Sequence, residues 1–273
     1  MRTGLVIALT LIFSHTLVSQ EKFKFGKISD EEVKSTVDEK FPDASAVVLY
    51  EEMDTRFTFD RPTGTGIINR YVVRIKILTN DGVDNANQFI STRLGRSNLD
   101  NESISGFTGY TYNWVGDKVE KTKLSKENIF VEKVTEYLSR TKFAFPLVKA
   151  GSVIEYKYEL SSPQFSYLEG FKFQRSIPVK YSRYFLQIPE YFTFDTDLKG
   201  YEKVKVTKSQ ESVSYLLTGG NTLSCSSNNL LFEVMDLPSL KDENYVWNLN
   251  DFMTRVTLEL KSVMVPGTVF KNF

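Results

Sequence analysis

The strongest constraint on the fold is the alternation of apolar and polar residues in short runs. Residues 154–160 show it most clearly, because charged residues separate the apolar ones throughout. Successive side chains of a β-strand point to opposite faces, so this pattern predicts a half-buried strand that follows a turn at residues 150–152. The apolar residues at every second position are Ile154, Tyr156, Tyr158 and Leu160.

The same two-residue period recurs along most of the chain. About a dozen or more short runs of this kind, separated by turn residues and with almost no helix between them, predict antiparallel packed sheets. The fold class expected is mainly β, an antiparallel β-sandwich with one short amino-terminal helix. Asp81 and Gly82 predict a tight hairpin after residues 70–79, and Gly116 with Asp117 predicts a two-residue hairpin turn.

The helix is expected from about residue 30 to 40. Ser29 and Glu32 have the spacing of a capping box, and Ile28 with Val33 can form the accompanying hydrophobic staple. Val33, Val37 and Phe41 share one helical face, and Pro42 ends the pattern.

Residues 1–20 have the pattern of a secretory signal peptide. Arg2 precedes an apolar run over residues 4–13, and a short stretch ending in small and polar residues follows. A run of about ten apolar residues is too short to cross a bilayer, which needs roughly twenty. We therefore expect export to the periplasm or cell surface without a transmembrane segment after cleavage. Residues 21–273 form the predicted β-sandwich module, with a soft subdivision near residue 200.

The charge balance and the reactive residues exclude several classes of function. The chain has 34 basic and 34 acidic residues, which gives no indication of a nucleic-acid partner. Its only histidine, His15, lies in the expected signal peptide, and its only cysteine is Cys225. Cysteine–histidine and serine–histidine catalysis are therefore excluded for the processed chain, as are metal sites built on histidine. We expect Cys225 to be buried and the protein not to be an enzyme; a carboxylate-based hydrolase is the least favoured alternative.

No metal and no cofactor is predicted. A calcium site is conceivable at Asp195 and Asp197, or at Asp81, Asp84 and Asn85, but neither set has the spacing of an EF-hand loop. Polar turn residues between strands are the favoured interpretation of both sets.

Aromatic residues give the best candidate for a binding surface. Tyr110, Tyr112 and Trp114 alternate along one predicted strand and could stack on a sugar or a peptide. Such residues also fill the interiors of sandwiches, and for any single one the core is the favoured location. A second aromatic group follows later in the chain: Tyr181, Tyr184, Phe185, Tyr191 and Phe192.

An ordered set of phrases resembles the 3857 domain-of-unknown-function family, the amino-terminal domain of exported bacterial transglutaminase-like proteins. The resemblance runs from about residue 25 to the last residue. It implies a β-rich domain without an assigned reaction, usually followed by a domain with a Cys-His-Asp site that has no matching positions here. The phrases include "FGKISDEEV", "RYVVRIKILTNDG", "ISGFTGYTYN", "FPLVKAGSVIEYKYEL", "SIPVKYSRYFLQIPEYF" and "LPSLKDENYVWNLNDFMTRVTLELKS".

These observations predict a non-catalytic exported module. Its expected role is to pack against a transglutaminase-like domain or to position that domain's substrate. The alternative is a stand-alone carbohydrate- or peptide-binding module of the periplasm or cell surface.

Overall fold

The computed structural model describes residues 23–61, 64–217, 219–240, 252–264 and 271–272. Within these ranges the protein is mainly β, with one short α-helix, which confirms the predicted fold class. The expected signal peptide, residues 1–20, lies outside the described residues. No described helix is both long and apolar enough to cross a bilayer.

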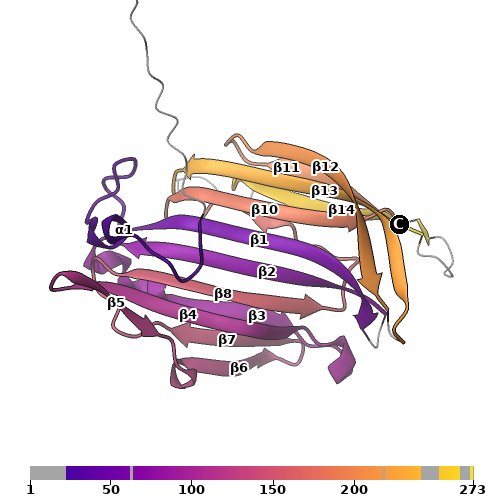
Figure 1. The fold of residues 1–273 in the computed structure, drawn as a ribbon, viewed down its shortest axis with the longest axis horizontal. Helices are drawn as coiled ribbons and strands as arrows, with labels where there is room; N and C mark the ends of the chain where they lie inside the picture. Colours follow the sequence, from indigo (N-terminus) through magenta and orange to yellow (C-terminus); the bar gives the residue numbers. More distant parts are fainter. Residues whose placement is uncertain (1–22, 62–63, 218, 241–251, 265–270, 273) are drawn as a thin grey trace, which may run out of the picture.

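The largest element is an eight-stranded twisted sheet (Figure 1). Its neighbouring strands are antiparallel with one exception, because β1 and β10 run parallel. Its strands in spatial order are β12 (Lys205–Leu216), β13 (Thr222–Leu237), β10 (Val179–Pro189), β1 (Ala46–Arg61), β2 (Gly64–Ile77), β8 (Val153–Ser162), β4 (Ser103–Val115) and β5 (Lys118–Lys123).

Two smaller sheets pack against one face of the large sheet and enclose the main core. In one sheet β11 (Phe192–Lys199), β14 (Arg255–Val263) and β15 (Lys271–Asn272) follow one another, and β9 (Phe171–Lys172) pairs with β14. The other has the order β3 (Asn87–Arg93), β7 (Leu138–Ala144), β6 (Ile129–Thr135). Ring pairs join the layers, with centroids 4.5 Å apart for Phe57 and Phe192 and 5.2 Å apart for Phe143 and Tyr156.

Two of the local predictions on turns had opposite outcomes. The hairpin at Gly116 is confirmed, because Val115 pairs with Lys118 and Gly116 has a φ of +59°. The hairpin at Asp81 is wrong, because residues Asn80–Ala86 form a 3₁₀-helix that carries the chain from β2 into a different sheet. A Cβ at Gly82 would lie 2.1 Å from the carbonyl oxygen of Ser45, so close backbone approach explains this glycine.

The helix is shorter than predicted. α1 spans Asp30–Lys34, and both hydrogen bonds of the capping box between Ser29 and Glu32 are present. Beyond it Asp38 accepts hydrogen bonds from the backbone N–H groups of Lys40 and Phe41, at 2.9 and 3.1 Å. This side-chain turn replaces the further helical turns that the apolar spacing suggested.

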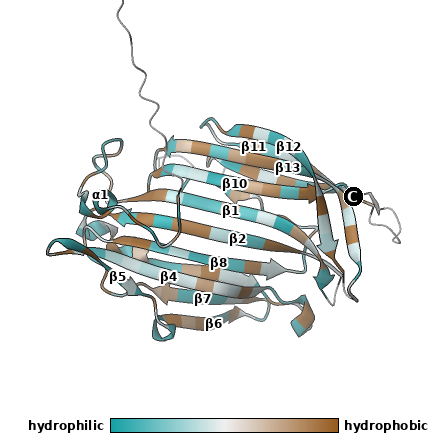
Figure 2. Cartoon of the chain, in the orientation of Figure 1, coloured by the Kyte–Doolittle hydropathy of each residue, from teal (hydrophilic) through white to brown (hydrophobic). Residues whose placement is uncertain are grey.

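Residues 23–34 cross the other face of the large sheet, so its middle strands are covered on both sides (Figures 1 and 2). Arg74 of β2 and Glu155 of β8 lie beneath them, 4% and 0% exposed, and their ion pair spans 2.6 Å. Arg74 also pairs with Glu32 of α1 at 2.8 Å, and Glu155 accepts a hydrogen bond from the backbone of Gly26. A buried ion pair therefore fastens the amino-terminal segment to the sheet.

We expect Arg74→Leu to lower the free energy of unfolding by about 3–5 kcal/mol, because it leaves the Glu155 carboxylate buried without its partner. The control is Arg70→Leu on the same strand and face. Arg70 and its partner Glu159 are 52% and 42% exposed, so this change should cost at most about 1 kcal/mol. Urea denaturation measures both values, and equal losses for the two variants would contradict the account.

Lys76 ties α1 to the same face. Its Nζ donates to the carbonyl oxygens of Val33 and Gly151, at 2.7 and 2.6 Å. Burial lowers the pKa of Lys76 to about 8, although the negative charge of Glu32 opposes part of this shift. The unfolded lysine titrates near its ordinary pKa of about 10.4.

The stability contributed at Lys76 should therefore rise between pH 8 and pH 10. In this interval the unfolded chain binds more protons at Lys76 than the folded chain, so the free energy of unfolding increases with pH. Chemical denaturation across this range, with Lys76→Met as the reference, isolates the effect from the titration of other groups. A difference between wild type and variant that is constant with pH would show that Lys76 titrates normally.

Candidate functional site: a cleft between the sheets

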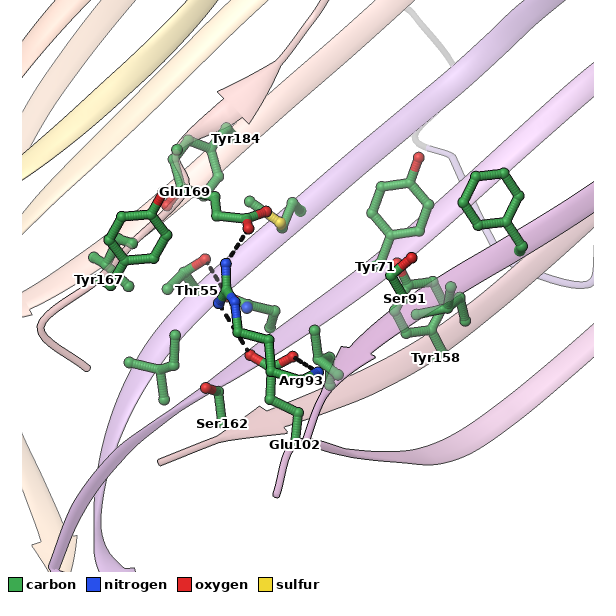
Figure 3. Close-up of a pocket in the computed structure, with 18 of the residues that line it drawn as sticks. Thr55, Tyr71, Ser91, Arg93, Glu102, Tyr158, Ser162, Tyr167, Glu169 and Tyr184 are labelled. Atoms are coloured by element: carbon green, nitrogen blue, oxygen red, sulfur yellow. Dashed lines mark hydrogen bonds and ion pairs between the residues drawn. The ribbon is translucent and has the colours of Figure 1, made fainter. Parts of the chain in front are cut away.

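A cavity of about 340 Å³ lies between the large sheet and the edge of β3 (Figure 3). Its walls come from β1, β2, β8 and β10 on one side, and from β3, Leu138 of β7, Glu102 and residues 167–170 on the other. This volume is at the lower end of the range for ligand pockets, about 300–1,000 Å³. Its polar and aromatic lining includes Thr55, Asn69, Tyr71, Ser91, Arg93, Glu102, Tyr158, Ser162, Tyr167, Glu169 and Tyr184.

The polar part of the wall follows from strand register. Thr55 of β1 stands opposite Asn69 of β2, so both side chains point to the core face. The Thr55 hydroxyl donates to the Asn69 side-chain oxygen at 2.7 Å. Two neighbouring strands thereby place paired polar groups, each with capacity for further hydrogen bonds, on the core face of the sheet.

Arg93 lies at the rim of the cleft, at the end of β3. Its guanidinium pairs with Glu102 at 3.4 Å and with Glu169, and lies 5.0 Å from the ring centre of Tyr167 (Figure 3). One positive charge thus faces two carboxylates, so this group of three ionised side chains carries a net charge of −1. Both acidic groups that line the cleft therefore have Arg93 as an ion-pair partner.

A buried polar cluster adjoins the cleft at Tyr71. The Tyr71 hydroxyl donates to Glu51, and Arg175 contacts both of these side chains. Burial raises the pKa of Tyr71 well above its usual range, with Arg175 opposing this shift and Glu51 adding to it. The phenol therefore stays protonated and acts as the donor to Glu51, whose side chain is 1% exposed.

A second cavity of about 410 Å³ begins on the other side of this cluster, where Arg175 lines it. Lys172, Gln174 and Gln88 supply further polar groups to its wall. Gln88 accepts a hydrogen bond of 2.8 Å from Tyr156 and is thereby held by the core. Because Arg175 and Tyr71 are in direct contact, the two cavities flank one ion-paired cluster.

Residues considered for other chemistry lie elsewhere. Cys225 of β13 is a free, buried thiol, as expected, and burial raises its pKa. Asp195 and Asp197 of β11 pair with Lys261 and Lys199. Across the described ranges no three histidine, cysteine or acidic side chains are grouped so that they could hold a metal ion.

The predicted aromatic surface lies on the opposite face of the large sheet from the cleft. Tyr112 is 1% exposed, and its hydroxyl donates to Glu155 at 2.9 Å. Tyr110 packs against Phe25, and Lys34 of α1 lies 4.0 Å from the ring centre of Trp114. The protein's own amino-terminal segment covers these rings, and ligand binding by them stays a prediction.

Sequence patterns did not point to the cleft. Tyr158 belongs to the clearest alternating strand, but that pattern identifies a face and not a cavity. Arg93, Glu102 and Glu169 stand at a strand end and in connecting segments, without a shared spacing. Only the tertiary fold brings them together.

Comparison with known proteins gives a family and a related fold. The model of DUF3857, a domain of unknown function, matches residues 64–230. No curated protein matches the sequence. A crystal structure of a candidate protease from Parabacteroides distasonis is similar, with a TM-score of 0.58 and 14% identity. The match covers 78% of this chain and 40% of that one.

An M1 zinc metallopeptidase from Deinococcus radiodurans also matches, with a TM-score of 0.33 and 10% identity over 88% of this chain and 49% of the other. At these identities the likeness to the Parabacteroides protein concerns the fold alone. The chain spans less than half the length of either structure. Because the family model matches more than half of the sequence, this chain belongs to the DUF3857 family.

Proposed function

We propose that this chain is a non-catalytic exported module that binds a ligand segment in the cleft between its sheets. In this role it positions a substrate for a transglutaminase-like domain, or packs against that domain. The observation that carries the proposal is the preformed cleft, whose acidic side chains, Glu102 and Glu169, are both engaged by Arg93. A binding site needs such fixed polar groups, whereas acid–base catalysis needs a group free to transfer a proton.

The lining supports binding of a small part of a larger ligand. Tyr158, Leu160 and Leu168 provide apolar surface, while Thr55 and Ser162 provide hydrogen-bonding groups. Polar groups that fix the orientation of a ligand beside apolar surface are typical of ligand sites. The modest volume suits a short segment or a side chain and excludes a whole domain.

The family resemblance supports a partner domain, and so does the outer side of the sheet formed by β3, β7 and β6. Lys142 of β7 pairs with Phe89 of β3 on one side and with Phe130 of β6 on the other. Both phenylalanine side chains are more than half exposed. Side chains directly opposite one another across a sheet lie close together, so the two rings flank one lysine. An exposed apolar pair of this kind is a natural contact for another protein surface.

A stand-alone carbohydrate- or peptide-binding module is the second candidate. The aromatic residues Tyr158, Tyr167 and Tyr184 in the wall of the cleft favour it, because ring faces can stack on sugars and on peptide groups. This function would need no partner domain.

A reconstitution experiment separates the two candidates. The purified chain is mixed with the transglutaminase-like domain of a DUF3857-containing protein, and association is followed by titration calorimetry. We expect association that Phe130→Asp weakens at least tenfold, about 1.4 kcal/mol, because a charge enters the apolar contact. Leu216→Asp, at the end of β12 and 64% exposed, is the control and should leave the affinity unchanged.

Absence of association, together with binding of a glycan by the isolated chain, would favour the stand-alone module. Turnover of a sugar or peptide by the purified chain, lost on a single carboxylate substitution, would contradict both.

A further inference from the structure

β3 presents an open backbone edge to the cleft. It is the terminal strand of its sheet, with β7 on one side and no strand paired with it on the other among the residues described. Such an edge displays N–H and C=O groups that can pair with an added strand. The direction in which these groups point decides whether the cleft can use them.

The hydrogen bonds of Arg93 give this direction. Its backbone N–H donates to the Glu102 carboxylate at 2.8 Å, and its C=O accepts from the Glu102 N–H at 3.0 Å. The N–H of the next residue, Leu94, donates to Tyr137 on the side of β7. Backbone groups alternate between the two edges of a strand, so those of Phe89 and Ser91 point away from β7, as those of Arg93 do.

The cavity lies along this edge. Phe89, Ile90 and Ser91 all line it, although neighbouring side chains in a strand point to opposite faces. Three consecutive residues can border one cavity when the strand turns its edge toward it. Figure 3 shows Ser91 and Arg93 along this side, with Tyr158 and Tyr167 among the residues around the same space.

The charge of the rim limits what can bind. Arg93 faces both Glu102 and Glu169, which leaves one negative charge in excess. Glu169 is 70% exposed and Glu102 only 7%, so Glu169 is the carboxylate that a ligand can reach while it stays paired with Arg93. The rim therefore favours a cationic group over an anionic one.

We propose that the cleft binds an extended peptide segment, which adds a strand along the edge of β3 and places a lysine or arginine side chain beside Glu169. This inference rests on the proposed function, because it names the ligand that the same cleft would bind. Backbone groups of Phe89 and Ser91, spaced two residues apart, match the repeat of a peptide strand. A glycan has no such repeat and would use the aromatic residues alone.

Three six-residue peptides test the inference on the full chain by calorimetry. The first alternates threonine and valine around one central lysine, with both ends blocked. We expect it to bind, and the same peptide with glutamate in place of lysine to bind at least tenfold more weakly. A third peptide, N-methylated at every residue so that neither of its edges can donate to a strand, should not bind.

Two substitutions, each with a control, locate the site. Ser91→Pro removes an edge N–H without removing a bond to β7, and edge strands tolerate proline; it should abolish binding, while Ser91→Ala retains it. Glu169→Gln should weaken binding of the lysine peptide at least threefold, and Glu202→Gln, an exposed residue between β11 and β12, should not change it.

Equal affinity for the lysine and N-methylated peptides would overturn the inference, as would chito-oligosaccharides binding the cleft in preference to all three peptides. The N-methylated peptide decides the point even if Ser91→Pro does not fold. Peptide binding without association with a transglutaminase-like domain would retain the inference and reject the partner role. Association with that domain without peptide binding would retain the partner role and reject the inference.

Discussion

The central strands β1, β2 and β8 are covered on both faces, and most of the structure follows from this constraint. One face carries the main core, and residues 23–34 cross the other. Each charged side chain on these strands must then find a partner or stay near solvent, because an unpaired buried charge costs several kcal/mol. Arg74 meets Glu155 beneath the amino-terminal segment, whereas Glu51, on the core side, meets Arg175. Arg74 and Glu155 bind the amino-terminal segment through Glu32 and Gly26, and Glu51 binds the segment that carries Arg175 to the opposite face.

The sequence was informative where structure depends on local pattern. The alternation in residues 154–160 predicted β8, and the spacing of Ser29 and Glu32 predicted the start of α1. The same alternation assigned Glu155 to a solvent face. Its burial depends on Gly26, 129 residues away, so no local pattern could reveal it. The end of α1 was misjudged for a similar reason, because Asp38 caps the following turn and pairs with distant Lys180.

The cleft was less predictable than the strands because it has no sequence period. Its walls come from six strands and two connecting segments, and the parallel pairing of β1 with β10 brings Tyr184 to Met53 and Thr55. Arg93 ends one strand, while Glu102 and Glu169 belong to connecting segments. The alternation of residues 154–160 indicated that Tyr158 lies on the apolar face of a strand, but not that a cavity lies beside it. The aromatic residues singled out from the sequence, Tyr110, Tyr112 and Trp114, lie on the other face beneath the amino-terminal segment, and a strand pattern does not show such covering.

The open edge of β3 differs from the outer edges of the large sheet in how it is protected. β12 and β5 carry charged side chains, including Lys205, Lys208 and Glu211 on β12, which discourage pairing with another chain. β3 has apolar or small residues at positions 89–91, and its protection is its place beside the cleft. Charged side chains at an edge disfavour pairing with any added strand. A narrow cavity beside an edge allows pairing only with a strand that fits into the cavity. Glu102 already bonds both backbone groups of Arg93, so an added strand would end its pairing at that residue, where the negative rim begins.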